Sequence, residues 1–163
     1  IEDLILKKEM ENIFFNSWLC IGRSNEINKS GEYKIFTIGN ESLFIIRNEN
    51  NKLKAFYNTC RHRGTRICSK KNGKYSKSIQ CPYHGWTYNL SGKLIGAPNM
   101  DAVEQFNKDN YPLFTADLFE WDGFILINLS ENPSEFKLEY KPIINRFLEW
   151  GIKDIEIYKS KVF

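Results

Sequence analysis

The chain has 163 residues, 42% of them hydrophobic and 15% aromatic, which suffices for one domain with an apolar core and excludes a disordered chain. The net charge of +3 is too small to indicate nucleic-acid binding, and no apolar run is long enough to cross a bilayer, so neither nucleic acid nor a membrane is an expected partner. The first residues lack the basic and apolar regions of a secretion signal, and we expect a reducing, cytoplasmic location.

The first expected element is a helix over residues 3–16, where apolar residues recur at helical spacing behind a capping Asp3. Short β runs separated by turn residues follow after Trp18. We expect these runs over residues 33–38, 42–47, 53–57, 78–80, 86–88, 93–95, 113–119 and 124–129. Looser segments lie between them, one of which is rich in Lys and Gly.

A short helix over residues 142–150 and an alternating strand over residues 155–163 are the last expected elements. The final strand has no later segment to pair with, which favours a piece of a larger protein. Together the runs predict an all-β fold of antiparallel sheets with short flanking helices.

The four cysteines do not predict disulfide bonds. Cys20 lies in the apolar stretch 18–21 and Cys68 follows Ile67, so both are expected to be small core residues rather than a bonded pair.

The other two cysteines belong to a pair of similar segments, Cys60-Arg61-His62 and Cys81-Pro82-Tyr83-His84. Eighteen residues separate them, and they contain the only two histidines of the chain. Each segment offers one thiolate and one imidazole, so the two together predict a metal centre with ligands Cys60, His62, Cys81 and His84.

Mixed cysteine and histidine ligands serve either zinc or iron–sulfur chemistry. In common zinc fingers one segment supplies both cysteines and another supplies both histidines. The mixed order found here favours a two-iron cluster, with Cys60 and Cys81 on one iron and the two histidines on the other. Gly64 and Gly85, which follow the two segments, suit a backbone that bends closely around such a cluster.

The segments 60–64 and 81–88 resemble the signature of the Rieske [2Fe–2S] family, and more narrowly that of the N-terminal domain of Rieske non-haem iron (ring-hydroxylating) oxygenase α subunits. Supporting matches are residues 92–98 and 121–129, so the resemblance covers nearly the whole chain. The interval between the two segments is slightly long for the family, which indicates an enlarged loop around residues 69–77.

The resemblance implies a Rieske-type antiparallel β sandwich over residues 1–163, with two cluster-binding loops and a [2Fe–2S] cofactor. It implies one-electron transfer from a ferredoxin or reductase to the mononuclear iron of an oxygenase that hydroxylates an organic substrate. In this family that Fe(II) lies in a C-terminal catalytic domain and is reached across a subunit boundary, so the catalytic domain of a neighbouring α subunit is an implied partner.

The same resemblance sets a limit on the chain. Both of its histidines are used by the cluster, so none remains for a mononuclear iron site. We therefore expect an oxidoreductase fragment that lacks the catalytic domain and is redox-active without being catalytic. Thr65, Tyr83 and Trp86 replace the extra cysteines and the serine of respiratory Rieske proteins, which implies a potential at the low end of the Rieske range, about −150 mV.

Two other functions stay open at this point. A stand-alone Rieske ferredoxin would use the same four ligands without an oxygenase domain, and a structural zinc module would use them without redox chemistry. A basic neighbourhood around the two segments is compatible either with docking of an acidic electron donor or with an ordinary solvated surface; it consists of Arg61, Arg63, Arg66, Lys70, Lys71, Lys74 and Lys77.

Overall fold

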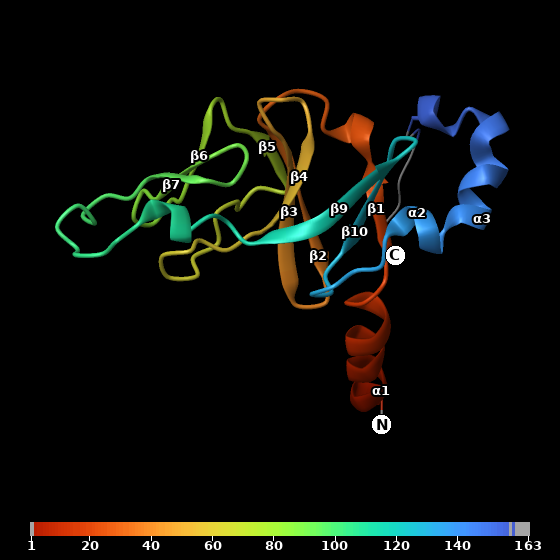
Figure 1. The fold of residues 1–163 in the computed structure, drawn as a ribbon, viewed down its shortest axis with the longest axis horizontal. Coiled ribbons are helices and arrows are strands. Elements are labelled where there is room, and N and C mark those ends of the chain that lie inside the picture. Colours follow the sequence, from red (N-terminus) through yellow and green to blue (C-terminus); the bar gives the residue numbers. More distant parts are fainter. Residues whose placement is uncertain (1, 157, 159–163) are drawn as a thin grey trace. The chain divides into compact units, whose positions relative to one another are not determined.

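The computed structural model describes residues 2–156 and 158. The chain forms two compact units, one made of residues 27–116 and the other of residues 1–26 and 117–163. The strand pairs among the described residues are antiparallel, which confirms the expected all-β class, and Figure 1 shows the strands with short helices at both ends of the chain.

The larger sheet of the unit 27–116 is built from consecutive hairpins. Its strands are β2 (Glu32–Ile38), β3 (Glu41–Arg47), β4 (Leu53–Tyr57) and β5 (Asn72–Lys74), in the order β5-β2-β3-β4. The first two residues of β9 (Thr115–Trp121) pair with β4 on that side. The β2–β3 turn contains Gly39 at φ 57°, a left-handed conformation that glycine adopts without steric cost.

Strand β5 was not expected from the sequence, which predicted only a loop over residues 69–77. It pairs with β2 and lies under the Tyr33 ring, where a Cβ on Gly73 would approach the Tyr33 hydroxyl to 2.7 Å. Glycine at this position therefore permits a close strand contact that a Lys- and Gly-rich composition does not reveal.

A second sheet of three strands lies in the same unit and carries part of the predicted metal centre. Its strands are β6 (Ser78–Gln80), β7 (Thr87–Asn89) and β8 (Leu94–Gly96), in the order β6-β7-β8. One apolar core joins both sheets and includes two of the predicted ligands; among its members are Phe44, Phe56, Cys60, Ile79, Cys81, Trp86 and Tyr88.

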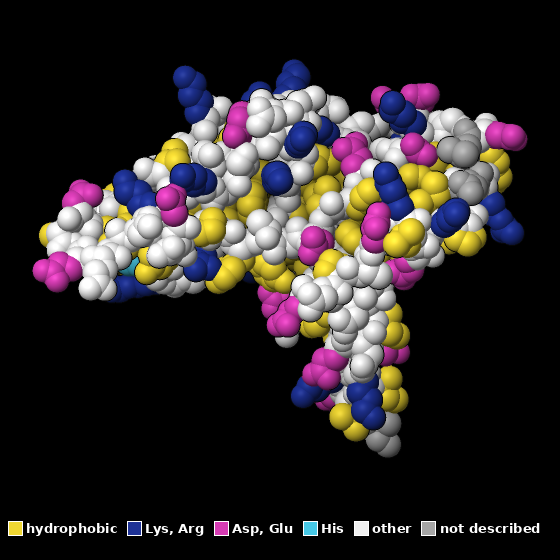
Figure 2. All heavy atoms as spheres, viewed as in Figure 1, with side chains coloured by type: hydrophobic (Ala, Val, Ile, Leu, Met, Phe, Trp, Pro, Cys, Tyr) yellow, Lys and Arg dark blue, Asp and Glu magenta, His cyan; other side chains and the backbone are white. Residues whose placement is uncertain are grey.

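The other unit begins with α1 (Glu2–Glu9), which continues as one π-helical stretch over Met10–Phe14. The helix thus ends close to the expected position, but Asp3 lies inside it rather than capping it. Leu4, Ile5 and Leu6 are each more than half exposed, and Figure 2 shows apolar side chains along this helix. Strand β1 (Leu19–Arg23) then pairs with β10 (Phe124–Asn128), which also pairs with β9.

Short helical segments follow β10, where one helix over residues 142–150 was expected. They are α2 (Phe136–Glu139), α3 (Lys141–Ile144) and 3₁₀ turns over Asn145–Trp150 and Ile152–Asp154. Gly151 ends the first of these turns at φ 59°, as expected of a glycine just past a helix end. Most of the strand expected over 155–163 lies outside the described residues, and Ile155, Glu156 and Tyr158 are not in a strand.

Candidate metal centre

Two loops with closely similar backbones carry the four predicted ligands. In the first loop the Gly64 amide donates to the Cys60 carbonyl at 2.9 Å, and in the second the Gly85 amide donates to the Cys81 carbonyl at 3.1 Å. The two glycines have φ values of 70° and 71°. Each loop is closed by a further bond from its cysteine amide, at 2.8 Å in both cases, to the carbonyl of Thr65 or Trp86.

The two thiols of these loops are buried and adjacent. Cys60 is 2% exposed and Cys81 is 3% exposed. The pKa of the Cys60 thiol is raised, chiefly because burial disfavours the thiolate and also through the neighbouring Cys81, while a contact from the Tyr88 hydroxyl opposes the rise. A bound cation that favours both thiolates fits this pair of sulfurs.

The two imidazoles form a second pair, with ring centroids 4.7 Å apart. Burial lowers the pKa of His62, and the nearby His84 and Arg63 lower it further, so the neutral ring that a metal requires is favoured. The Nδ1 atom of His62 is buried and has no hydrogen-bond partner among the described residues. A buried nitrogen without a partner is costly unless a ligand such as a metal ion occupies it.

Aromatic rings cover both imidazoles. Trp86 stacks on His62 with a centroid distance of 4.9 Å and an interplanar angle of 9°. The ring of Tyr83, which is 61% exposed, lies against the His84 ring, and the two ring centroids are 3.7 Å apart. One face of the His62 ring is thus covered by a buried side chain, whereas His84 is covered by a side chain at the surface.

The four side chains form two neighbouring pairs. Cys60 lies next to Cys81, and His62 lies next to His84, so the two thiols could hold one iron and the two imidazoles the other iron of a two-iron cluster.

One residue that supports the first loop was not identified from the sequence. Asn58 is 2% exposed, and its Oδ1 accepts from the Ile67 and Cys68 amides at 3.1 and 2.8 Å. Its Nδ2 donates to the Cys68 carbonyl at 2.8 Å. Asn58 therefore fixes the segment that follows the first loop, and only its position two residues before Cys60 hinted at this role.

The Tyr88 hydroxyl contacts one of the four predicted ligands. Its Oη lies 3.4 Å from the Cys60 Sγ and accepts from the Arg61 amide at 3.2 Å. The side chains of the basic neighbourhood differ in exposure. Arg61 is half-buried, whereas the other six Lys and Arg residues are exposed.

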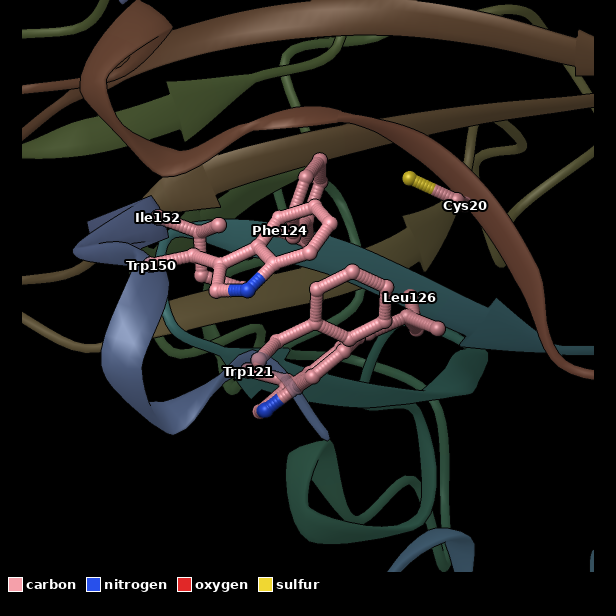
Figure 3. A pocket seen from close by; sticks show the side chains of 7 residues that line it. Cys20, Trp121, Phe124, Leu126, Trp150 and Ile152 are labelled. Carbon is pink, nitrogen blue, oxygen red and sulfur yellow. The ribbon is translucent and has the colours of Figure 1, made fainter. Parts of the chain in front are cut away.

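A separate apolar cavity lies in the unit that contains β1 and β10 (Figure 3). It has a volume of about 410 Å³ and offers no polar lining group to a metal or charged ligand; its walls are Cys20, Trp121, Phe124, Leu126, Phe147, Trp150 and Ile152. Cys20 is exposed, so its expected core position is wrong: in the described part of the chain its side chain lies at the wall of this cavity and is not packed in the core. Cys68 is buried as expected, and both thiols are free.

Comparison with known proteins gives one family-model match, to the Rieske [2Fe–2S] domain over residues 17–107. The chain is 40% identical over 128 residues to the carnitine monooxygenase oxygenase subunit of Acinetobacter baumannii, covering 78% of this chain and 34% of that protein. It is 37% identical over 125 residues to the glycine betaine monooxygenase oxygenase subunit of Chromohalobacter salexigens, covering 77% of this chain and 28% of that protein.

Solved structures agree with these matches. The apo form of a quaternary ammonium Rieske monooxygenase superimposes with a TM-score of 0.87 at 35% identity, covering 94% of this chain and 45% of that one. Naphthalene 1,2-dioxygenase from a Rhodococcus species gives a TM-score of 0.80 at 27% identity, covering 86% of this chain and 32% of that one.

The chain spans about a third of the length of the curated relatives it matches. No helix in the described part of the chain combines the length and apolar character needed to span a bilayer. The Rieske model matches more than half of the chain, and the match contains both cysteine–histidine loops. The chain therefore belongs to the Rieske [2Fe–2S] domain family, and its relatives are oxygenase subunits of that family.

Proposed function

We propose that this chain is the electron-relay domain of a Rieske oxygenase, with Cys60 and Cys81 as ligands of one iron and His62 and His84 as ligands of the other. The observation that carries the proposal is the pairing of two buried thiols and of two imidazoles on loops of the same backbone, with His62 Nδ1 buried and without a partner among the described residues. A Rieske [2Fe–2S] cluster accepts and releases one electron at a potential raised by its neutral histidine ligands.

The surrounding residues prepare this site for its cluster. Trp86 covers one face of the His62 ring, and the lowered pKa of that ring favours its neutral form. The Tyr88 hydroxyl lies against the Cys60 sulfur, where a donated hydrogen bond stabilises a thiolate. His84, beneath the exposed Tyr83, is the ligand nearest to an approaching redox partner in this proposal.

The proposed electron source is a ferredoxin or reductase, and the proposed acceptor is the mononuclear iron of a catalytic domain outside these 163 residues. Support comes from the relatives, which are oxygenase subunits more than twice as long, and from a related solved structure whose description names inter-subunit electron transfer. The structural match covers 94% of this chain rather than the Rieske segment alone, which favours an oxygenase origin over a stand-alone ferredoxin.

Anaerobic reconstitution with iron and sulfide tests the ligand set. We expect a red-brown protein with two iron and two sulfide per chain and a midpoint potential of about −150 mV by protein-film voltammetry. Cys60→Ser, His62→Ala, Cys81→Ser and His84→Ala should each abolish this cluster, whereas Cys68→Ser is the matched control that keeps it. A colourless protein that holds one zinc ion would contradict the proposal.

Two further measurements test the relay role. Reduction by an acidic ferredoxin should slow as salt rises if the exposed basic residues dock it, because salt screens charges over about 10 Å at 0.1 M. The reconstituted chain should be reducible without oxygenating a substrate. Substrate turnover by the 163 residues alone would show that the catalytic function does not need another domain.

A further inference from the structure

Arg61 lies between two proposed ligands, but its side chain leaves the first loop and packs elsewhere. Its Cζ atom is 3.8 Å from the ring centroid of Phe114 and 5.9 Å from that of Tyr111. Its Nη2 donates to the Asn110 carbonyl at 3.4 Å. Arg61 thereby ties the first loop to residues 110–114, about fifty positions further along the chain.

The backbone of the same residue is anchored in a different direction. The Arg61 amide donates at 3.2 Å to the hydroxyl of Tyr88, a residue of β7, and that hydroxyl also touches the Cys60 sulfur. Arg61 is thus held at both ends, by β7 through its amide and by an aromatic surface through its guanidinium. Any displacement of Arg61 must move Cys60 and His62, its two neighbours in sequence.

The charge of Arg61 is not cancelled by an acidic partner. Within the described residues no carboxylate forms an ion pair with it, and the nearby Asp109 is paired with Lys93 at 2.9 Å. Stacking on an aromatic face stabilises a guanidinium without neutralising it. A positive charge next to a cluster that gains an electron favours the reduced state.

We propose that Arg61 is a positioning residue of the first loop, which its planar guanidinium clamps against Phe114 and Tyr111, and that its uncompensated charge raises the potential of the site. The proposal rests on the proposed function, because the second half requires a cluster in these loops. The clamp itself is a property of the polypeptide and is measurable without metal.

Two variants distinguish the effect of the flat guanidinium group from the effect of its positive charge. Arg61→Lys keeps the charge and loses the flat stacking group, whereas Arg61→Gln loses both. Arg66→Gln is the matched control, because Arg66 is an exposed cation of the same loop region. Phe114→Leu removes the opposing ring while leaving Arg61 in place, and Phe114 is 52% exposed, so this change should not unfold the protein.

Amide hydrogen exchange of the metal-free protein tests the clamp. The Gly64 amide should exchange about tenfold faster in Arg61→Lys, Arg61→Gln and Phe114→Leu, as expected for loss of a cation–π contact. The equivalent Gly85 amide of the second loop should be unchanged. The double variant Arg61→Lys/Phe114→Leu should be no worse than the more affected single variant, because both remove one shared contact.

Voltammetry of the reconstituted protein tests the charge. The midpoint potential should fall in Arg61→Gln, stay close to the parent value in Arg61→Lys, and be unaffected in Arg66→Gln. Unchanged Gly64 exchange in both Arg61 variants would overturn the clamp, and an unchanged potential in Arg61→Gln would overturn the role of charge. If the parent protein binds no cluster, the proposed function fails, while the exchange experiment still decides the clamp.

Discussion

The two ligand loops have nearly the same backbone but are held in place by different means. Both use a glycine near φ 70° and the same pair of closing hydrogen bonds. The second loop connects two paired strands, since Gln80 of β6 lies opposite Thr87 of β7. The first loop has only the isolated bridge between Thr59 and Arg66 at its base.

Side chains replace strand pairing around the first loop. Asn58 bonds the segment behind it, Tyr88 bonds its amide and sulfur, and Arg61 packs it on distant rings. Strand pairing depends on backbone and tolerates many sequences, whereas a side-chain network fails when one member is removed. The first loop should therefore be the more sensitive of the two to single substitutions.

The largest expected effect is that of Asn58→Ala. This change leaves the Ile67 and Cys68 amides and the Cys68 carbonyl without their partner in a buried site, which should cost about 3–5 kcal/mol of unfolding free energy. Guanidinium unfolding followed by tryptophan fluorescence measures the loss.

Asn89→Ala is the matched control on the side of the second loop. Asn89 also accepts two backbone amides, from Ser91 and Lys93, but it is half-buried and water can replace it. We expect a loss of about 1 kcal/mol. Equal losses at the two asparagines would mean that the first loop does not depend on its buried amide.

The next largest effect concerns the left-handed glycine that each loop contains. Gly64→Ala and Gly85→Ala should each cost about 1–2 kcal/mol, because both place a side chain in the left-handed region. The costs should be similar, since a Cβ at Gly64 meets nothing within 4 Å and one at Gly85 meets Pro98 at an ordinary 3.6 Å.

Gly96→Ala serves as the control for the glycine pair. Gly96 has no positive φ, and its added Cβ would lie 3.4 Å from the Thr87 Cβ. Its loss in urea unfolding should be clearly smaller than that of either loop glycine. A harmless Gly64→Ala would show that the first loop does not keep the left-handed turn seen at Gly85.

This contrast also explains which parts of the site the sequence could predict. The four proposed ligands could be named from the sequence because each segment places a cysteine and a histidine within four positions and the two segments contain the only two histidines. Most strands were predictable from alternation and turn residues. The side-chain contacts that support the first loop could not be predicted, because the contact of Arg61 with Phe114 joins residues that no local sequence pattern connects.

Two wrong expectations, the core position of Cys20 and the loop in place of β5, have the same cause, which is contact between residues far apart in the sequence. Cys20 lies in an apolar run that indicates a core strand, but whether a strand side chain is covered depends on what packs on its face of the sheet, and the Cys20 side chain is exposed. Strand β5 is three residues long and exists through pairing with β2, so its own composition predicts a loop.

A smaller effect is expected from the hydroxyl that only the first loop receives. Tyr88→Phe removes the contact with the Cys60 sulfur and the Arg61 amide and should cost about 1 kcal/mol. In reconstituted protein it should also lower the midpoint potential, because a donor to a ligand sulfur stabilises the reduced state.

Tyr75→Phe is the matched change for Tyr88→Phe. The Tyr75 hydroxyl makes a comparable 3.5 Å contact with the sulfur of Cys68, which is not a proposed ligand. Its removal should leave the potential unchanged while costing similar stability. A shift of equal size in both variants would assign the effect to general loosening of the core rather than to the ligand contact.

The smallest expected effect concerns the spare thiol that follows the first loop and has no equivalent after the second. Burial raises the pKa of Cys68 to about 11, and Cys68 is 1% exposed, so its thiol is protonated and shielded at pH 8. Iodoacetamide reacts with thiolates, so Cys68 should be alkylated at least roughly a hundredfold more slowly than the exposed Cys20 in folded protein. Peptide mass spectrometry resolves the two sites, and denatured protein, in which both react alike, supplies the control. Rapid alkylation of Cys68 without unfolding would show that the segment held by Asn58 opens in solution, which would make the first loop looser than its buried network of hydrogen bonds implies.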